Sequence, residues 1–139
     1  MPGPAITHLY TGDDGESHFR DGWLRTRLME SGAREFVADG LDTVRLSEFR
    51  LEGSERFRNA PRRQIIIHLQ GVDEVDCGNG EVRQFGPGDL VFADDTTGRG
   101  HTSREVAGPR ILLFIHCPDS LSVDAIMAYD RADGSGDRK

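Results

Sequence analysis

The apolar positions of this chain fall in short runs that are rich in β-branched residues and separated by turn residues. Three such runs lie at 65–67, 90–92 and 111–115. Gly78-Asn79-Gly80 contains the Asn-Gly pair of a tight hairpin, and Gly86-Pro87-Gly88-Asp89 is typical of another turn. Short strands about 8–12 residues apart, punctuated by glycine and proline, predict an all-β sandwich or barrel. The predicted strands are 43–51, 63–70, 73–77, 81–85, 89–93, 101–106 and 110–117.

Helical patterning is confined to one segment near the C-terminus. Residues 121–130 carry apolar side chains at a spacing that predicts one short helix after the last strand. Residues 22–30 are ambiguous, and we expect a strand or turn there that packs Trp23 and Leu28 against the sheet.

The length of 139 residues suits one domain and is short for two. We therefore expect a single domain over 1–139, with its core at about 40–118. The ends, 1–5 and 131–139, are polar and glycine-rich, so they are expected to fray.

The charge balance argues against a nucleic-acid partner. Acidic residues number 24 against 17 basic ones, which gives a net charge of −7, and Lys139 is the single lysine. A phosphate backbone is held by clustered basic side chains, whereas the arginines here are interspersed with acids. No apolar run approaches the roughly 18 residues of a membrane-spanning helix, so no membrane association is expected.

The cysteines and the N-terminal residues bear on location. Cys77 and Cys117 do not have the spacing of a metal finger. The first residues lack the basic and apolar regions of a signal peptide. The expectation is a cytoplasmic protein with two reduced thiols.

Two passages in the middle of the chain carry a resemblance to a known family. The first is Asn59-Ala60-Pro61-Arg62-Arg63-Gln64, which runs into a strand ending at Gly71. The second is Phe85-Gly86-Pro87-Gly88-Asp89-Leu90, followed by Asp94-Asp95-Thr96-Thr97-Gly98-Arg99-Gly100-His101. In these passages, and in the opening segment 10–19, the chain resembles small single-domain bacterial cupins. The resemblance implies a cupin-type jelly-roll β-barrel with a side-chain-lined cavity, assembled as a homodimer.

Cupins usually hold a divalent metal through two motifs, and the first is degenerate here. Laid on this sequence, the motif H-x-H-x-x-x-E falls on Arg58, Ala60 and Gln64, and the histidine of the second motif is His101. Arginine is a permanent cation without an acceptor, alanine offers no ligand atom, and a glutamine amide is a weak oxygen ligand. Transition metals need three or four well-placed ligands. The usual metal site should be absent, and no cofactor is expected.

Strand alternation extends the candidate site beyond these motif positions. If Gln64 points inward as the resemblance implies, His68 points inward as well. The same rule places Ser103 and Glu105 on the side of His101, whereas the orientation of His116 stays open. The candidate cavity residues are Arg58, Gln64, His68, His101, Ser103, Glu105 and His116.

Two other charged pairs have plainer interpretations. Asp94 and Asp95 are adjacent at a strand end, so their side chains should point to opposite sides and belong to the turn that shapes 96–100. Arg62 and Arg63 stand at a strand start, where a surface or salt-bridging pair is expected.

Three functional hypotheses remain open. In the first, His101 or His68 is a general acid or base, and Arg58 binds a carboxylate or a developing oxyanion. The protein would then be an isomerase, cyclase, dehydratase or epimerase that acts on a small organic anion. Analogy with other proteins of this fold suggests a role in specialised metabolism. In the second, one divalent transition metal occupies a relocated site of His68, His101 and His116 and supports lyase, cyclase or dioxygenase chemistry. In the third, the cavity binds a small molecule without turnover, because a lone histidine on a strand is more often structural than catalytic.

Overall fold

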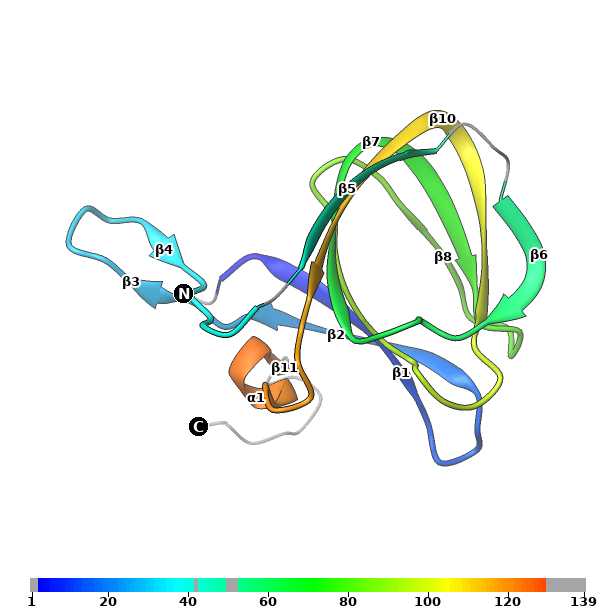
Figure 1. Ribbon diagram of the computed structural model, residues 1–139, viewed down its shortest axis with the longest axis horizontal. Coiled ribbons are helices and arrows are strands. Elements are labelled where there is room, and N and C mark those ends of the chain that lie inside the picture. Colours follow the sequence, from blue (N-terminus) through cyan, green and yellow to red (C-terminus); the bar gives the residue numbers. More distant parts are fainter. Residues whose placement is uncertain (1–2, 42, 50–52, 130–139) are drawn as a thin grey trace.

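The structure, a computed structural model, describes residues 3–41, 43–49 and 53–129, and these residues fold mostly as β-strands (Figure 1). In chain order the elements are β1 (Ala5–Thr11), β2 (Ser17–Leu24), β3 (Arg27–Leu28), β4 (Arg34–Glu35), β5 (Val44–Phe49), β6 (Gly53–Arg58), β7 (Gln64–Asp76), β8 (Val82–Phe85), β9 (Leu90–Asp94), β10 (His101–His116), α1 (Val123–Ile126) and β11 (Met127–Tyr129).

One large mixed sheet contains every described strand except the small β3–β4 hairpin. Its neighbour order is β11-β2-β1-β9-β7-β10-β5, with β6 also paired to β10 and β8 to β7. Strands β1 and β9 run parallel, and the other pairs are antiparallel. The prediction of a mostly β protein is therefore confirmed. Among the described residues the end strands β11 and β5 do not pair with each other, so the expected barrel is an open, bent sheet.

Two long strands make the bend that hollows this sheet. The sequence predicts separate strands at 63–70 and 73–77 and at 101–106 and 110–117, but each pair is one continuous strand, β7 and β10, which arch side by side in Figure 1. Where β7 and β10 bend together, Gly71 is required. Its φ is +82°, and a Cβ added to it would lie 2.7 Å from the Pro109 carbonyl oxygen. The bend places side chains from both halves of each strand around one interior.

Apolar side chains are buried on both faces of the sheet. One cluster lies between the sheet and the C-terminal segment and is formed by Ile6, Ile65, Phe92, Cys117, Ile126 and Met127. The other lies on the hollowed side and is formed by Leu9, Val75, Cys77, Phe85 and Val91. Burial on both faces explains why the 65–67 run is continuously apolar rather than alternating.

The ends of the chain contribute more to the core than the sequence predicts. Ile6 and Met127 are 2% and 1% exposed, so the core extends well beyond 40–118. Pro4 accepts a hydrogen bond from the Leu24 N–H and Ala5 begins β1, so residues 4–5 are paired rather than frayed. Residues 1–2 and 131–139, the remainder of that prediction, lie outside the described residues.

Two local expectations need correction. The helix predicted over 121–130 is limited to α1, because residues 127–129 turn into β11 and pair with β2. Within the described residues α1 is the only helix, and its four residues are too few to cross a bilayer. Leu28, expected to pack on the sheet, is 63% exposed in the β3–β4 hairpin.

Candidate functional site

The hollowed side of the sheet encloses a cavity of about 420 Å³. Its lining is mainly apolar, with polar side chains at a few positions, as is usual for small-molecule sites. The apolar part includes Leu9, Phe49, Ile66, Val75, Phe85, Val91, Leu112 and Phe114. The polar part includes Arg56, Arg58, Asn59, Gln64, His68, Asp73, His101, Ser103 and Arg110.

His101, at the start of β10, is held against a buried carboxylate. Its Nδ1 lies 2.5 Å from Oδ2 of Asp95, a residue with no exposed surface. The same oxygen accepts a hydrogen bond of 2.7 Å from the Ser17 hydroxyl. Because a carboxylate only accepts, Nδ1 is the donor, and the neutral ring keeps its lone pair on Nε2. Nε2 has no hydrogen-bonding partner within residues 3–41, 43–49 and 53–129.

The backbone before His101 fixes the ring beside Arg58. Residues His101 and Arg58 are paired across β10 and β6, and both line the cavity. Gly100 has a φ of +84°, and an added Cβ would lie 2.2 Å from the Arg58 carbonyl oxygen. Only glycine fits this close approach, so the turn from Gly98 to Gly100 delivers the imidazole to the cavity.

His68, on β7, is fully buried in the cavity wall with a defined tautomer. Its Nδ1 lies 3.0 Å from the Asp89 carbonyl oxygen, which also accepts the His68 backbone N–H. A carbonyl only accepts, so Nδ1 carries the proton. The ring stacks on Phe85 with centroids 5.5 Å apart, and Nε2 faces Oδ1 of Asp73 at 3.4 Å.

Beyond Asp73 the cavity wall contains a buried chain of charges. Arg110, 5% exposed, lies 3.5 Å from Asp73 Oδ2 through one terminal nitrogen. Its Nε donates to Glu105 at 3.2 Å. A buried guanidinium between two carboxylates compensates charges that would otherwise be costly in this interior.

The other sequence-predicted site residues are placed as follows. Gln64 is 4% exposed and lines the cavity, with no hydrogen-bonding partner for its Oε1 among the described residues. Ser103 also lines the cavity, whereas Glu105 contributes through Arg110. His116 lies in a separate groove, where its Nδ1 accepts from Arg62 at 2.6 Å.

The residues present do not fit the metal that the cupin resemblance implies. Arg58, Ala60, Gln64 and His101 all line the cavity, but only the last offers a strong nitrogen ligand. The relocated set does not assemble either, because His116 is directed to Arg62. No group of three histidine, cysteine, aspartate or glutamate side chains in the described parts of the chain is arranged to hold a metal ion.

A second histidine cluster lies on the opposite face of the sheet and connects β1, β9 and β11. His8 contacts Tyr129 OH at 2.5 Å and Asp94 at 2.9 Å, and Arg63 contacts the other oxygen of Asp94 at 3.0 Å. Burial raises the pKa of Asp94, but the hydrogen bonds from His8 and Arg63 outweigh it and hold that pKa below its usual range. Asp94 and Asp95 thus point to opposite sides, as alternation predicts, and the first is structural.

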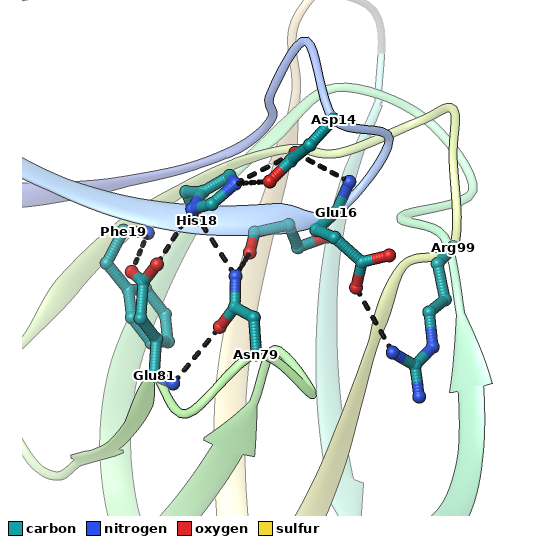
Figure 2. A network of polar contacts seen from close by, with 8 residues as sticks. Asp14, Glu16, His18, Phe19, Asn79, Glu81 and Arg99 are labelled. Carbon is teal, nitrogen blue, oxygen red and sulfur yellow. Dashed lines mark hydrogen bonds and ion pairs between the residues drawn. The ribbon is translucent and has the colours of Figure 1, made fainter.

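His18 forms a third cluster, outside the cavity, between two hairpins (Figure 2). Its Nδ1 lies 2.7 Å from Glu81 Oε2, and its Nε2 lies 2.9 Å from Asp14 Oδ2. Both nitrogens face acceptors, so the ring is an imidazolium. The hydrogen bonds that the ring donates to Asp14, first, and to Glu81 raise the pKa of His18. This clamp joins the β1–β2 turn to the turn before β8.

The two cysteines are free and buried. Burial raises the pKa of Cys77 to about 12 and also raises that of Cys117. Thiols with raised pKa values are poor nucleophiles, so these side chains act as small packing residues.

Sequence reasoning missed three participants in the site. Asp95 was assigned to the turn, although its position six residues before His101, across a glycine-rich turn, is a usable signal. No sequence signal predicts the contact between Arg110 and Asp73, because it forms only where β7 and β10 bend together.

No protein-family model matches this chain, and no curated protein is similar enough to be a recognised relative.

Proposed function

We propose that this chain is a cupin-type enzyme that acts on a small organic anion by acid–base chemistry without a metal ion. One observation carries the proposal: His101 lines the cavity with Nδ1 held by buried Asp95, and its Nε2 has no partner among the described residues. A histidine oriented by a buried carboxylate is the arrangement that enzymes use for proton transfer.

The cupin part of the proposal is supported by where the motif positions lie. Arg58, Ala60, Gln64 and His101 are separated by up to 43 positions in the sequence, since 101 − 58 = 43, yet they line one cavity. That is the arrangement expected if the family's cavity persists while its metal ligands have been replaced.

Six of the residues predicted from the sequence have a proposed role. His101 takes or gives the proton, and His68, whose ring is fixed by Asp89, is a second acid–base group. Arg58 binds the anionic group of the substrate or stabilises a developing oxyanion. Gln64 and Ser103 supply hydrogen bonds, and Glu105 acts through Arg110.

The test uses untagged protein dialysed against a chelator and incubated in deuterated water with a panel of small keto and hydroxy acids. Deuterium uptake and product formation are followed by NMR. We expect turnover without added metal, reduced about 10²–10⁴-fold in His101→Gln. His18→Gln, a histidine change outside the cavity, is the matched control and should retain turnover.

Turnover that depends on added transition metal would contradict the proposal and favour a metal-dependent mechanism. Tight binding of a compound that is never converted would instead favour the non-catalytic binding hypothesis. Wild-type turnover in the His101→Gln protein would remove His101 from the mechanism.

We further propose that the protein is a homodimer. The edge strand β5 exposes Val44 and Leu46 at 63% and 67%, and Leu69 on β7 is 49% exposed. Leu46 is paired with Leu113 of β10, so these side chains continue one apolar face. Exposed apolar sheet edges are common contact sites between subunits.

A further inference from the structure

Two buried oxygen atoms of the cavity wall lack a hydrogen-bond donor. Asp73 and Gln64 are 5% and 4% exposed, and both line the cavity. In the described parts of the chain nothing donates to Asp73 Oδ1 or to Gln64 Oε1. Leaving buried acceptors unpaired is costly, so such atoms usually have a partner that is supplied from elsewhere.

The side chain next to Asp73 Oδ1 is His68. His68 donates through Nδ1 to the Asp89 carbonyl, and its Nε2 lies 3.4 Å from Asp73 Oδ1 in a contact that does not make a hydrogen bond to that oxygen. Asp73 Oδ1 is therefore left without a donor at this position in the cavity wall. A hydroxyl or amino group placed there would donate to it.

The charges around Asp73 are compatible with a neutral donor. Its other oxygen, Oδ2, faces Arg110, which also pairs with Glu105. Because the guanidinium compensates the carboxylate charge, the site does not require a cationic ligand. The remaining wall, including Leu112 and Phe114, is apolar.

We infer that the cavity selects a ring-sized organic anion bearing a hydroxyl or amino group remote from its anionic group. The donor group binds Asp73 Oδ1, the ring packs against the apolar wall, and the anionic group lies at Arg58. This inference shares its cavity with the proposed function and specifies the class of substrate for that site.

The test measures binding rather than turnover. The probes are 6-hydroxy-2-naphthoate, 6-amino-2-naphthoate and 2-naphthoate, which share ring and carboxylate and differ in the donor. We expect the hydroxy or amino probe to bind at least about tenfold more tightly than 2-naphthoate. In Asp73→Asn this ratio should fall to about threefold or less.

The control is Glu74→Gln, the same change at the neighbouring carboxylate of β7, which pairs with Arg104 outside the cavity, and it should keep the ratio. If Asp73→Asn fails to fold by circular dichroism, the ratio is measured in Asp73→Glu, which keeps the charge but moves the carboxylate away from the position of Oδ1. Equal binding of all three probes, binding of none, or a ratio retained in the folded variant would overturn the inference.

The outcome is separable from that of the proposed function. The binding ratio should persist in His101→Gln, in which turnover is lost. If the protein prefers probes with a donor group but shows no turnover, the inference about the ligand stands and the proposed enzymatic function is wrong. If it shows turnover but no preference for a donor group, the proposed function stands and the inference about the ligand is wrong.

Discussion

His101 and Asp95 form a pair in which a fully buried carboxylate holds one ring nitrogen of a cavity-lining imidazole at 2.5 Å. The pair joins the strand that begins at His101 to the residue that directly follows β9, six positions earlier in the chain. It assigns the proton of the neutral ring to Nδ1 and leaves Nε2 as the basic atom.

Asp95→Asn tests the positioning role of this carboxylate. An amide can present an N–H toward Nδ1, which would favour the opposite tautomer, so turnover should fall at least about 100-fold. Ser17→Ala is the comparison, because it removes the other hydrogen bond to the same oxygen and leaves the His101 contact. It should cost about 1 kcal/mol of unfolding free energy with a much smaller loss of turnover. Equal losses of turnover would argue against positioning by Asp95.

Gly100→Ala tests the turn that delivers His101 and Arg58 to the cavity. The substitution places a Cβ against the Arg58 carbonyl in a left-handed backbone conformation, so destabilisation by about 2 kcal/mol or more is expected in urea unfolding. Gly88→Ala is the matched control, since Gly88 has a φ of +91° but no atom within 4 Å of the added Cβ. It should cost about 1 kcal/mol. The same cost at both positions would mean that the close approach at Gly100 does not matter.

The His18 clamp predicts a pH-dependent contribution to stability. The raised pKa of His18 means that its contribution is complete below its ordinary value of 6.5 and is lost as pH rises through the raised pKa. The pKa of Glu81 is pushed up by burial but lowered overall by the Phe19 N–H and His18, so its contribution is present above its ordinary value of 4.5 and is lost as pH falls. The clamp should be strongest between these two values.

The measurement compares wild type with His18→Gln by denaturant unfolding at pH 5.5 and pH 8.5. The difference in unfolding free energy should be larger at pH 5.5. A difference that is unchanged or larger at pH 8.5 would contradict the imidazolium assignment.

Leu46→Lys tests the proposed dimer. The change places a charge on the exposed apolar face of the edge strand, where burial in a subunit contact would be costly. Sedimentation should show a wild-type dimer and a variant shifted to monomer, with unfolding of the isolated chain little changed. A monomeric wild type would end the proposal.

The sequence predicted the strands of the middle of the chain well, because alternation and turn residues are local signals. Gln64 and His101, which the resemblance places inward, and His68, which alternation places beside Gln64, all line the cavity. The continuity of β7 and β10 escaped prediction, since a glycine and a proline that usually end strands here mark a bend within paired strands.

The features that the sequence left open or missed share a physical cause. His116 has the parity of the inner face, but at the strand end it contacts Arg62 of another loop, which no local pattern encodes. Arg110 and Asp73 come together only through the pairing of two bent strands, and the closed barrel implied by the family resemblance is an open sheet among the described residues.

The central claim is that Asp95 holds the proton of the neutral His101 ring on Nδ1 and leaves Nε2 unprotonated, and long-range ¹H–¹⁵N NMR of histidine-labelled protein tests it most directly. His101 is assigned by the signal that disappears in His101→Gln. At a pH where this ring is neutral, we predict shifts of a protonated Nδ1 and an unprotonated Nε2. The opposite tautomer would contradict the account.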